Sequence, residues 1–256
     1  MHGGGLYAGA VRLHPESSMN ILILQPIRPT NPPVLRAVAD ALLARLPAAN
    51  PGLTFDIRQD DRAPEIPPHP SLYMRHATVR NFMLDTYLKP EHDAVLWIDS
   101  DLIEYPADLP TQLYRVVHRE GHKVYLPDDS DDDTPFRYPD ERVIAAPLAI
   151  LSPSSGWPER FYDIGGFIER GSRARLFPPW FDQAGPVIEL DSVGCCYLAP
   201  AWLYRAGVRY RPPPTDYYVE HWSVMQQARE RGVRIVALTD VRAVHAWLPD
   251  YGLEAN

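Results

Sequence analysis

Residues 94–101 read AVLWIDSD, and this stretch decides the fold class. Its five apolar residues are typical of a short strand buried on both faces of a parallel sheet, and Asp99-Ser100-Asp101 follows them directly. In open α/β sheets, ligands bind outside the carboxyl ends of the strands. The stretch therefore predicts a buried strand that delivers two carboxylates to a ligand site.

The segments around this strand alternate between strand and helix patterns. Strands are predicted at 20–27, 53–58, 143–151, 187–198 with a break at Gly194, 233–238 and 243–247, and helices at 34–46, 76–88, 107–118 and 217–231. Such alternation favours right-handed crossovers between parallel strands. We therefore predict an α/β fold with a mostly parallel central sheet flanked by helices. Residues 19–256 are expected to form a single domain, and residues 1–18 a disordered leader.

Composition and charge exclude several other classes of protein. The chain has 256 residues and a net charge of −8, which disfavours a nucleic-acid partner because phosphate binding needs a basic surface. Its two cysteines, Cys195 and Cys196, are adjacent, so no disulfide framework is expected. No apolar run approaches the roughly 18 residues of a membrane span, and residues 1–18 lack the apolar core of a signal peptide. A cytoplasmic protein without a membrane span is expected.

The D-x-D pattern at the end of a buried strand suits metal and phosphate chemistry. Carboxylates one residue apart on a turn can both face one hard divalent cation, which bridges two oxygens of a nucleoside diphosphate. We expect Asp101 to bind the metal directly and Asp99 to contact it through water or to contact the ribose of the nucleotide. A capping or solubilising role is the structural alternative. Phosphatases with a D-x-D nucleophile place it on the first strand, which disfavours that class here.

A set of short motifs resembles the fungal Golgi α-mannosyltransferase subunits of glycosyltransferase family 62. The resemblance spans residues 20–247 with the order kept. It implies a GT-A fold, a manganese-type ion, retention of anomeric configuration and GDP-mannose as donor. The chain departs from the family in lacking a membrane anchor, in Cys195-Cys196 and in the acidic insertion 128–141. The matching motifs are Arg80-Asn81-Phe82-Met83-Leu84, Leu88-Lys89-Pro90, His92, Val95-Leu96-Trp97-Ile98-Asp99-Ser100-Asp101, Tyr105-Pro106, Phe161-Tyr162-Asp163-Ile164, Glu189-Leu190-Asp191-Ser192-Val193-Gly194, Tyr218-Val219-Glu220-His221 and Val244-His245.

The resemblance assigns metal and nucleotide roles to several residues. His245, on the last predicted strand, is expected to be the third protein ligand of the metal. Arg80 is expected to contact the diphosphate, since a guanidinium matches paired phosphate oxygens, with a surface salt bridge as the alternative. Gln25, Arg28 and Asp60 lie at the ends of the first two strands, where a GT-A fold receives the nucleoside.

Three carboxylates are candidates for the catalytic residues near the transferred sugar: Asp163, Asp191 and Glu220. Asp191 follows an apolar run and is expected to bind donor-sugar hydroxyls. Glu220 opens a predicted helix and is expected to position the acceptor, with a favourable helix-dipole position as the structural alternative. Gly194 would let the backbone approach the ligand closely.

These expectations define an enzyme that moves a hexosyl unit, mannosyl first, from a GDP- or UDP-sugar to the hydroxyl of a glycan or another acceptor, with Mn²⁺ or Mg²⁺. A nucleic-acid base is a minority candidate for the acceptor. A non-catalytic nucleotide-sugar- or glycan-binding module of the same fold is the alternative from another class. A sugar nucleotidyltransferase needs a glycine-rich basic loop after its first strand, where this chain has QPIRPTNPP. The acidic loop 128–141 is expected to be a solvated surface loop, because it lacks the spaced glycine and terminal glutamate of an EF-hand.

Overall fold

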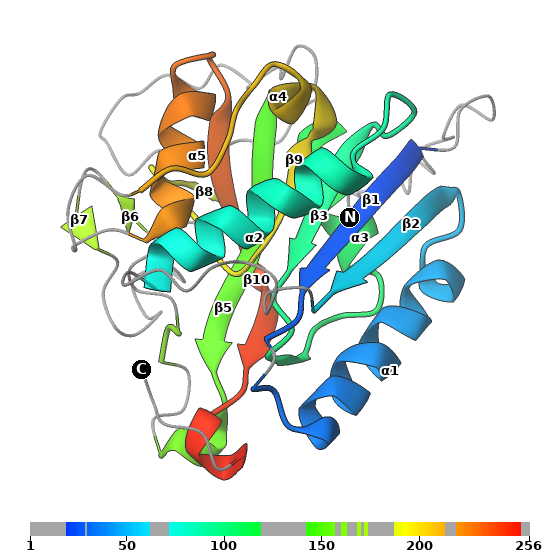
Figure 1. Cartoon of the computed structure of the whole chain (residues 1–256), viewed down its shortest axis with the longest axis vertical. Coiled ribbons are helices and arrows are strands. Elements are labelled where there is room, and N and C mark those ends of the chain that lie inside the picture. The colour runs from blue at the N-terminus through cyan, green and yellow to red at the C-terminus, as the bar shows by residue number, and fades with distance from the viewer. Residues whose placement is uncertain are drawn as a thin grey trace, which may run out of the picture.

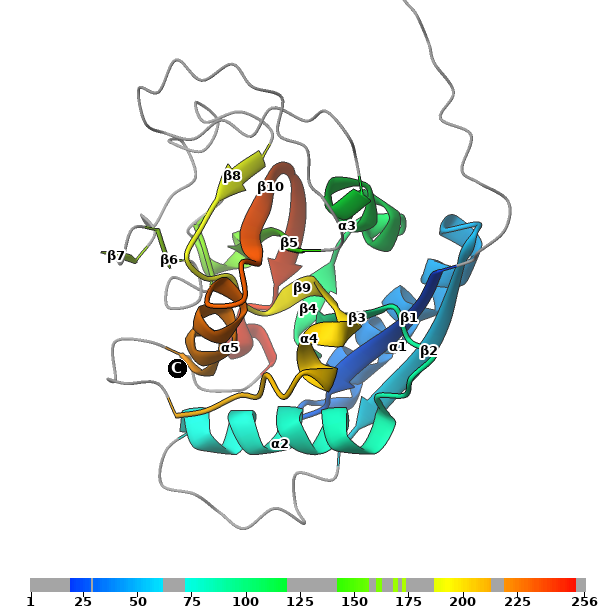
Figure 2. The ribbon, with the colours of Figure 1, turned by 90° about the horizontal axis from the view of Figure 1, so that it is seen from above.

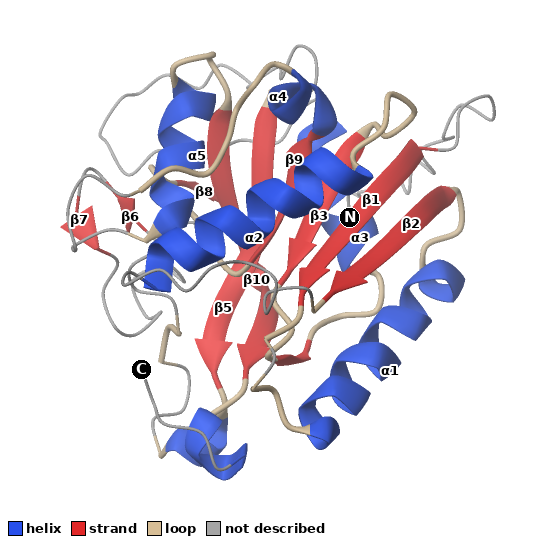
Figure 3. Cartoon of the chain, viewed as in Figure 1, coloured by secondary structure: helices blue, strands red, loops and turns tan. Residues whose placement is uncertain are grey.

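A central sheet of eight strands organises the chain (Figures 1 and 3). The computed structural model describes residues 19–28, 30–61, 72–118, 142–156, 160–162, 168–169, 172–173, 187–212 and 219–251. The strands of the sheet lie in the order β2-β1-β3-β9-β5-β10-β4, and β8 pairs with β10. The sheet strands are β1 (Met19–Pro26), β2 (Leu53–Asp60), β3 (Ala94–Ile98), β4 (Leu102–Glu104), β5 (Val143–Leu151), β8 (Val187–Glu189), β9 (Cys196–Pro200) and β10 (Arg234–His245), and a separate pair is formed by β6 (Ile168–Glu169) and β7 (Ser172–Arg173).

Most strands of the sheet run in one direction. β2, β1 and β3 are mutually parallel, and β9 is antiparallel to both β3 and β5, which gives β5 the direction of β3. β10 is parallel to β5, whereas β4 and β8 are antiparallel to β10. The predicted α/β fold is therefore confirmed, with five strands in one direction and three in the other. The antiparallel insertion of β9 was not predicted, because an apolar run does not encode strand direction.

Helices cover both faces of the sheet. α2 crosses one face with α5 beside it, and α3 lies against the opposite face (Figures 1 and 2). Among the described residues, no helix combines the length and apolar character needed to cross a bilayer. The helices are α1 (Pro33–Ala49), α2 (Leu72–Tyr87), α3 (Leu109–His118), α4 (Ala201–Arg205) and α5 (Glu220–Arg229), with 3₁₀ turns η2 (Pro153–Ser155) and η4 (Leu248–Tyr251).

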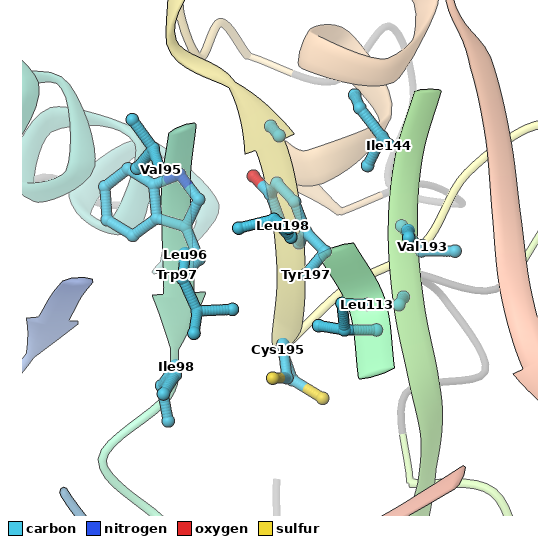
Figure 4. Close-up of a cluster of buried hydrophobic side chains, with 14 of the residues drawn as sticks. Val95, Leu96, Trp97, Ile98, Leu113, Ile144, Val193, Cys195, Tyr197 and Leu198 are labelled. Atoms are coloured by element: carbon cyan, nitrogen blue, oxygen red, sulfur yellow. The ribbon is translucent and has the colours of Figure 1, made fainter. Parts of the chain in front are cut away.

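The core is centred on β3 and its antiparallel neighbour β9. Leu96 pairs with Leu198 and Trp97 with Tyr197, and each of these side chains is at most 1% exposed (Figure 4). The indole Nε1 of Trp97 donates a hydrogen bond of 3.0 Å to the hydroxyl of Tyr204, so its polar atom is satisfied inside the core. Burying such side chains stabilises the fold by about 1.5–3 kcal/mol each, which anchors the turn that follows β3.

The last strand differs from its prediction in a way that matters for the site. Two strands were expected at 233–238 and 243–247, but β10 is one continuous strand from Arg234 to His245. Its register against β5 shifts between Leu238 and Arg242, as in a β-bulge. After the bulge, β10 continues beside β5, and His245 pairs with Leu151, the last residue of β5, at the carboxyl end of the sheet.

Candidate metal and nucleotide site

Five parallel strands deliver polar residues to one edge of the sheet. Arg28 lies two residues beyond β1, Asp60 ends β2, Asp99 follows β3, Ser152 follows β5 and His245 ends β10. Because the strands point the same way, their carboxyl ends meet along this edge. This is the edge at which α/β sheets bind ligands.

Asp101 and His245 form the innermost pair at this edge. Asp101 Oδ1 lies 3.0 Å from His245 Nε2, and the two side chains are 1% and 0% exposed. The pair is positioned by β4, which aligns antiparallel with the end of β10 so that Leu102 faces His245. A backbone hydrogen bond of 2.8 Å from Ala246 N to Asp101 O closes the arrangement. The D-x-D turn is thus fixed against the last strand by the residues that follow it.

The His245 ring is held on its other side. Its Nδ1 lies 2.7 Å from the carbonyl oxygen of Ala246, a contact in which Nδ1–H donates. The Tyr162 ring stacks on the imidazole with an interplanar angle of 10°. Fixing Nδ1 on a backbone carbonyl is the usual way of presenting Nε2 of a histidine to a metal. The contacts of His245 therefore suit a ligand role.

The atoms that face each other in this pair lack hydrogen bonds. Both carboxylate oxygens of Asp101 and Nε2 of His245 are buried. Oδ1 pairs with His245 and Oδ2 with Arg28 as ion pairs, but none of the three atoms forms a regular hydrogen bond with a described residue. Buried polar atoms are normally hydrogen-bonded. Burial alone would raise the pKa of Asp101, but the charges of His245 and Arg28 hold it well below its ordinary value, so the side chain is a carboxylate. A buried carboxylate and an imidazole nitrogen that face each other 3.0 Å apart without a regular hydrogen bond fit a divalent cation.

Asp99 points to a different partner. Its Oδ1 accepts a hydrogen bond of 2.6 Å from NH2 of Arg80, a side chain that is 4% exposed. Within the described residues, no three carboxylate, imidazole or thiol groups gather at metal-ligand spacing. The structure brings Asp101 and His245 together, and one oxygen of Asp99 is paired to Arg80.

Arg80 is buried between aromatic rings. Its guanidinium carbon lies 5.0 Å from the centre of the Trp97 ring and 5.6 Å from that of Tyr210. Its Nε lies 3.5 Å from Glu220 Oε1, so the guanidinium faces the carboxylate that follows β3 and the one that begins α5. These contacts let Arg80 hold Asp99 and Glu220 in place, and its expected contact with a diphosphate stays a prediction.

Glu220, the first residue of α5, is surrounded by donors. Oε1 lies 3.5–3.6 Å from Arg80 Nε, His76 Nδ1 and His221 Nε2. Burial raises the pKa of Glu220, but His221, His76 and Arg80 together lower it well below its ordinary value. The side chain is therefore a carboxylate with little tendency to take up a proton.

The residues predicted for nucleoside binding lie on the same edge. Gln25 is buried and accepts a hydrogen bond of 2.9 Å from Gln59, while Asp60 accepts one of 2.9 Å from the Tyr87 hydroxyl. Gly194 precedes Cys195, whose carbonyl accepts a hydrogen bond of 2.9 Å from Asp99 N. Gly194 is thus next in sequence to Cys195, the residue whose backbone contacts the D-x-D turn.

Of the other two predicted carboxylates, Asp191 does not join this cluster. Asp191 Oδ1 forms an ion pair of 2.7 Å with Arg229, the last residue of α5, whereas Glu220 is the first residue of that helix. β8 runs antiparallel to β10, so its carboxyl end, and Asp191 after it, lie toward the start of β10. Asp163 lies outside the described residues.

Several residues of the site were missed by reasoning from the sequence. Asn31 Nδ2 donates a hydrogen bond of 2.9 Å to Ser100 Oγ and ties the loop after β1 to the D-x-D turn. Tyr162 belongs to one of the motifs that carry the family resemblance, but no role was predicted for it. His76 is four residues before Arg80 on α2, so helical spacing alone could have placed both on one face.

The comparisons with known proteins give weak likenesses of fold. No protein-family model and no curated protein sequence matches the chain. The catalytic domain of Drosophila beta1,4galactosyltransferase 7, solved in complex with xylobiose, aligns at 10% identity and a TM-score of 0.48 over 88% of this chain and 67% of that one. GalNAc-T7 with UDP, GalNAc and Mn²⁺ aligns at 10% identity and a TM-score of 0.49 over 90% of this chain, which spans 43% of that chain.

A third solved structure is a glycosyltransferase involved in the glycosylation of the major capsid of PBCV-1. It aligns at 12% identity and a TM-score of 0.39 over 88% of this chain and 81% of that one. All three TM-scores are below 0.5 and all three identities are far below 25%. These likenesses assign no activity to the chain.

Proposed function

We propose that this chain is a metal-dependent glycosyltransferase of the GT-A type. It transfers a hexosyl unit from a nucleoside-diphosphate sugar to an acceptor hydroxyl. The observation that carries the proposal is the buried Asp101–His245 pair, whose facing atoms lie 3.0 Å apart without a hydrogen bond at the ligand-binding edge of the sheet. The motif resemblance to the family 62 mannosyltransferases supports the same reaction class.

Asp101 and His245 are the residues that would hold the cation, Mn²⁺ or Mg²⁺. Such an ion would neutralise the charge that develops on the departing nucleoside diphosphate. Arg28, which is 30% exposed beside Asp101, is placed to contact the diphosphate. Gln25 and Asp60, at the ends of β1 and β2, would then lie on the nucleoside side of the site.

Glu220 would orient the acceptor. A carboxylate whose pKa is held well below its ordinary value is a poor general base at neutral pH. Hydrogen bonding to an acceptor hydroxyl needs no proton uptake and suits a reaction that retains anomeric configuration, as the resemblance implies. We propose GDP-mannose as the first donor to test, with UDP-sugars second, and a glycan or another hydroxyl-bearing molecule as acceptor.

Release of nucleoside diphosphate tests the proposal. The purified chain is incubated with GDP-, UDP- and dTDP-sugars, with and without Mn²⁺, and the released nucleotide is quantified. We expect release from one nucleotide class, dependent on metal, and a loss of about 10²-fold or more in Asp101→Asn and His245→Ala. Asp85→Asn is the matched control, because Asp85 is 63% exposed and pairs with Arg209 away from the site.

Two outcomes would count against the enzyme. Metal-dependent stabilisation by a nucleotide without any release would favour a non-catalytic nucleotide-sugar-binding module. Release that persists undiminished in folded Asp101→Asn would refute the assigned site.

A further inference from the structure

Arg28 contacts the outer oxygen of the carboxylate on which the proposed site depends. Its NH1 lies 3.3 Å from Asp101 Oδ2, while Oδ1 of the same carboxylate faces His245. Arg28 is 30% exposed and Asp101 is 1% exposed, so the guanidinium lies between the buried carboxylate and the solvent. The carboxylate of Asp101 thus has an inner oxygen, Oδ1, that faces the imidazole of His245, and an outer oxygen, Oδ2, that faces the long, flexible side chain of Arg28.

On the basis of the proposed function, we propose that Arg28 is a placeholder cation. It neutralises Asp101 while the metal site is vacant and moves to the diphosphate when metal and nucleotide bind. A buried carboxylate is unfavourable unless its charge is compensated, and Arg28 supplies a positive group at Oδ2 in addition to His245 at Oδ1. A guanidinium and a divalent cation on one carboxylate repel each other, so the two cannot share Asp101 favourably.

The local structure allows the side chain to move while the backbone stays in place. Ile27 N is bonded to Asp60 O at 2.8 Å, and Arg28 O accepts from Asn31 N at 3.0 Å. The backbone on both sides of Arg28 is therefore tied down. The pKa of Arg28 is raised chiefly by Asp101, with burial opposing and with smaller contributions from Tyr162 and Asp99. The guanidinium is thus a permanent cation that can exchange one anionic partner for another.

This arrangement makes metal and nucleotide binding cooperative. When metal binds without nucleotide, it must displace Arg28 from Asp101, and this cost weakens the binding of the metal. A diphosphate offers Arg28 a second anionic partner and a matching pair of oxygens, so each ligand strengthens the binding of the other. Removing Arg28 should therefore strengthen the binding of metal alone and weaken the binding of nucleotide in the presence of metal. A residue with a merely structural role would not give effects of opposite sign.

Titration of Mn²⁺ by electron paramagnetic resonance tests the inference, since free Mn²⁺ gives the signal and bound Mn²⁺ loses it. Wild type, Arg28→Met and Arg28→Lys are titrated alone and with GDP or UDP, with corrections for nucleotide-bound metal. In Arg28→Met, we expect Mn²⁺ alone to bind at least about fivefold tighter than in wild type, the lower end of typical coupling between sites. The nucleotide should no longer strengthen Mn²⁺ binding in that variant, whereas Arg28→Lys should keep part of the coupling.

Arg58→Met is the matched control. Arg58 Nε pairs with Asp56 Oδ1 at 2.6 Å on the same sheet but away from the proposed metal ligands, so its loss should leave Mn²⁺ binding unchanged. Mn²⁺ binding to Arg28→Met that is no tighter than to wild type, or undiminished coupling to nucleotide, overturns the inference. Absence of Mn²⁺ binding by wild type overturns it together with the metal site. If metal and nucleotide binding are coupled as expected but no sugar is transferred, the proposed enzyme activity is refuted and the inference about Arg28 stands.

Discussion

Replacing Arg80 by Met tests whether one buried guanidinium holds the two carboxylates of the site together. Met keeps most of the volume and flexibility of the side chain but removes its charge and its donors. In the native chain, Arg80 NH2 lies 2.6 Å from Asp99 Oδ1, and Arg80 Nε lies 3.5 Å from Glu220 Oε1. The substitution leaves Asp99 and Glu220, which are 16% and 4% exposed, without this counter-ion.

The burial of these groups sets the expected magnitude. Removing one partner of a buried ion pair costs about 3–5 kcal/mol, because the other charge remains buried. We expect Arg80→Met to lower the free energy of unfolding by that amount. Glu220→Gln should cost about 1–2 kcal/mol, because Arg80 keeps its shorter contact with Asp99. The double variant should be less destabilised than the sum by about 2 kcal/mol, within the usual range for contacting residues.

Urea unfolding at neutral pH measures all four members of this cycle. Arg229→Met is the control: Arg229 pairs with Asp191 at 2.7 Å but is 48% exposed, and a surface pair of this kind is worth about 0–1 kcal/mol. A cost below about 1 kcal/mol for Arg80→Met would contradict the reasoning. Additive costs in the cycle would show that Arg80 and Glu220 do not interact.

Three further predictions concern the surroundings of the site. Burial and the charge of Arg80 lower the pKa of His221 from 6.5 to about 4, with Glu220 opposing. The contribution of neutral His221 to the free energy of unfolding is therefore complete above pH 6.5 and is lost as the pH falls toward 4, by up to about 3 kcal/mol. In His221→Asn, the urea midpoint should change less with pH across this interval. An unchanged pH profile would exclude His221 as the cause. Asn50 is 0% exposed and joins α1 to α3 through hydrogen bonds with Leu46 O, Ala107 O and Thr111 N. Asn50→Ala should therefore lower the free energy of unfolding in urea by about 2–4 kcal/mol, and a loss under about 1 kcal/mol would contradict this role. Tyr162→Ala should weaken Mn²⁺ binding, measured by calorimetry, by about tenfold, because His245 loses the ring stacked on it. Tyr162→Phe keeps the ring and should bind Mn²⁺ as wild type does. Equal binding by wild type and both variants would exclude the stacking role.

The elements that could be predicted from the sequence are those with the strongest apolar signal. The bounds of β3 and β5 agree with prediction, because both strands are fully buried and read as continuous apolar runs. β4 and α4, with three and five residues, are too short for periodicity to indicate them. The direction of β9 depends on its partners on both sides, and no local pattern specifies it.

The same distinction applies to the site. The convergence of Asp101 and His245 could be expected, because Asp101 comes shortly after β3, His245 ends β10 and parallel strands end at one edge. The partner of Asp99 could not be expected, since it depends on how α2 lies across the sheet and turns Arg80 inward. Asp191 was expected at the ligand edge from its apolar strand, but β8 runs opposite to β10 and directs that end the other way.

Anomalous diffraction at the manganese edge, from crystals grown with Mn²⁺ and GDP or UDP, tests the central claim most directly. The account predicts one strong peak within about 2.5 Å of both an Asp101 oxygen and His245 Nε2, with diphosphate oxygens completing the coordination. Manganese located elsewhere, or a nucleotide bound at this edge with no metal between it and Asp101, would contradict the account.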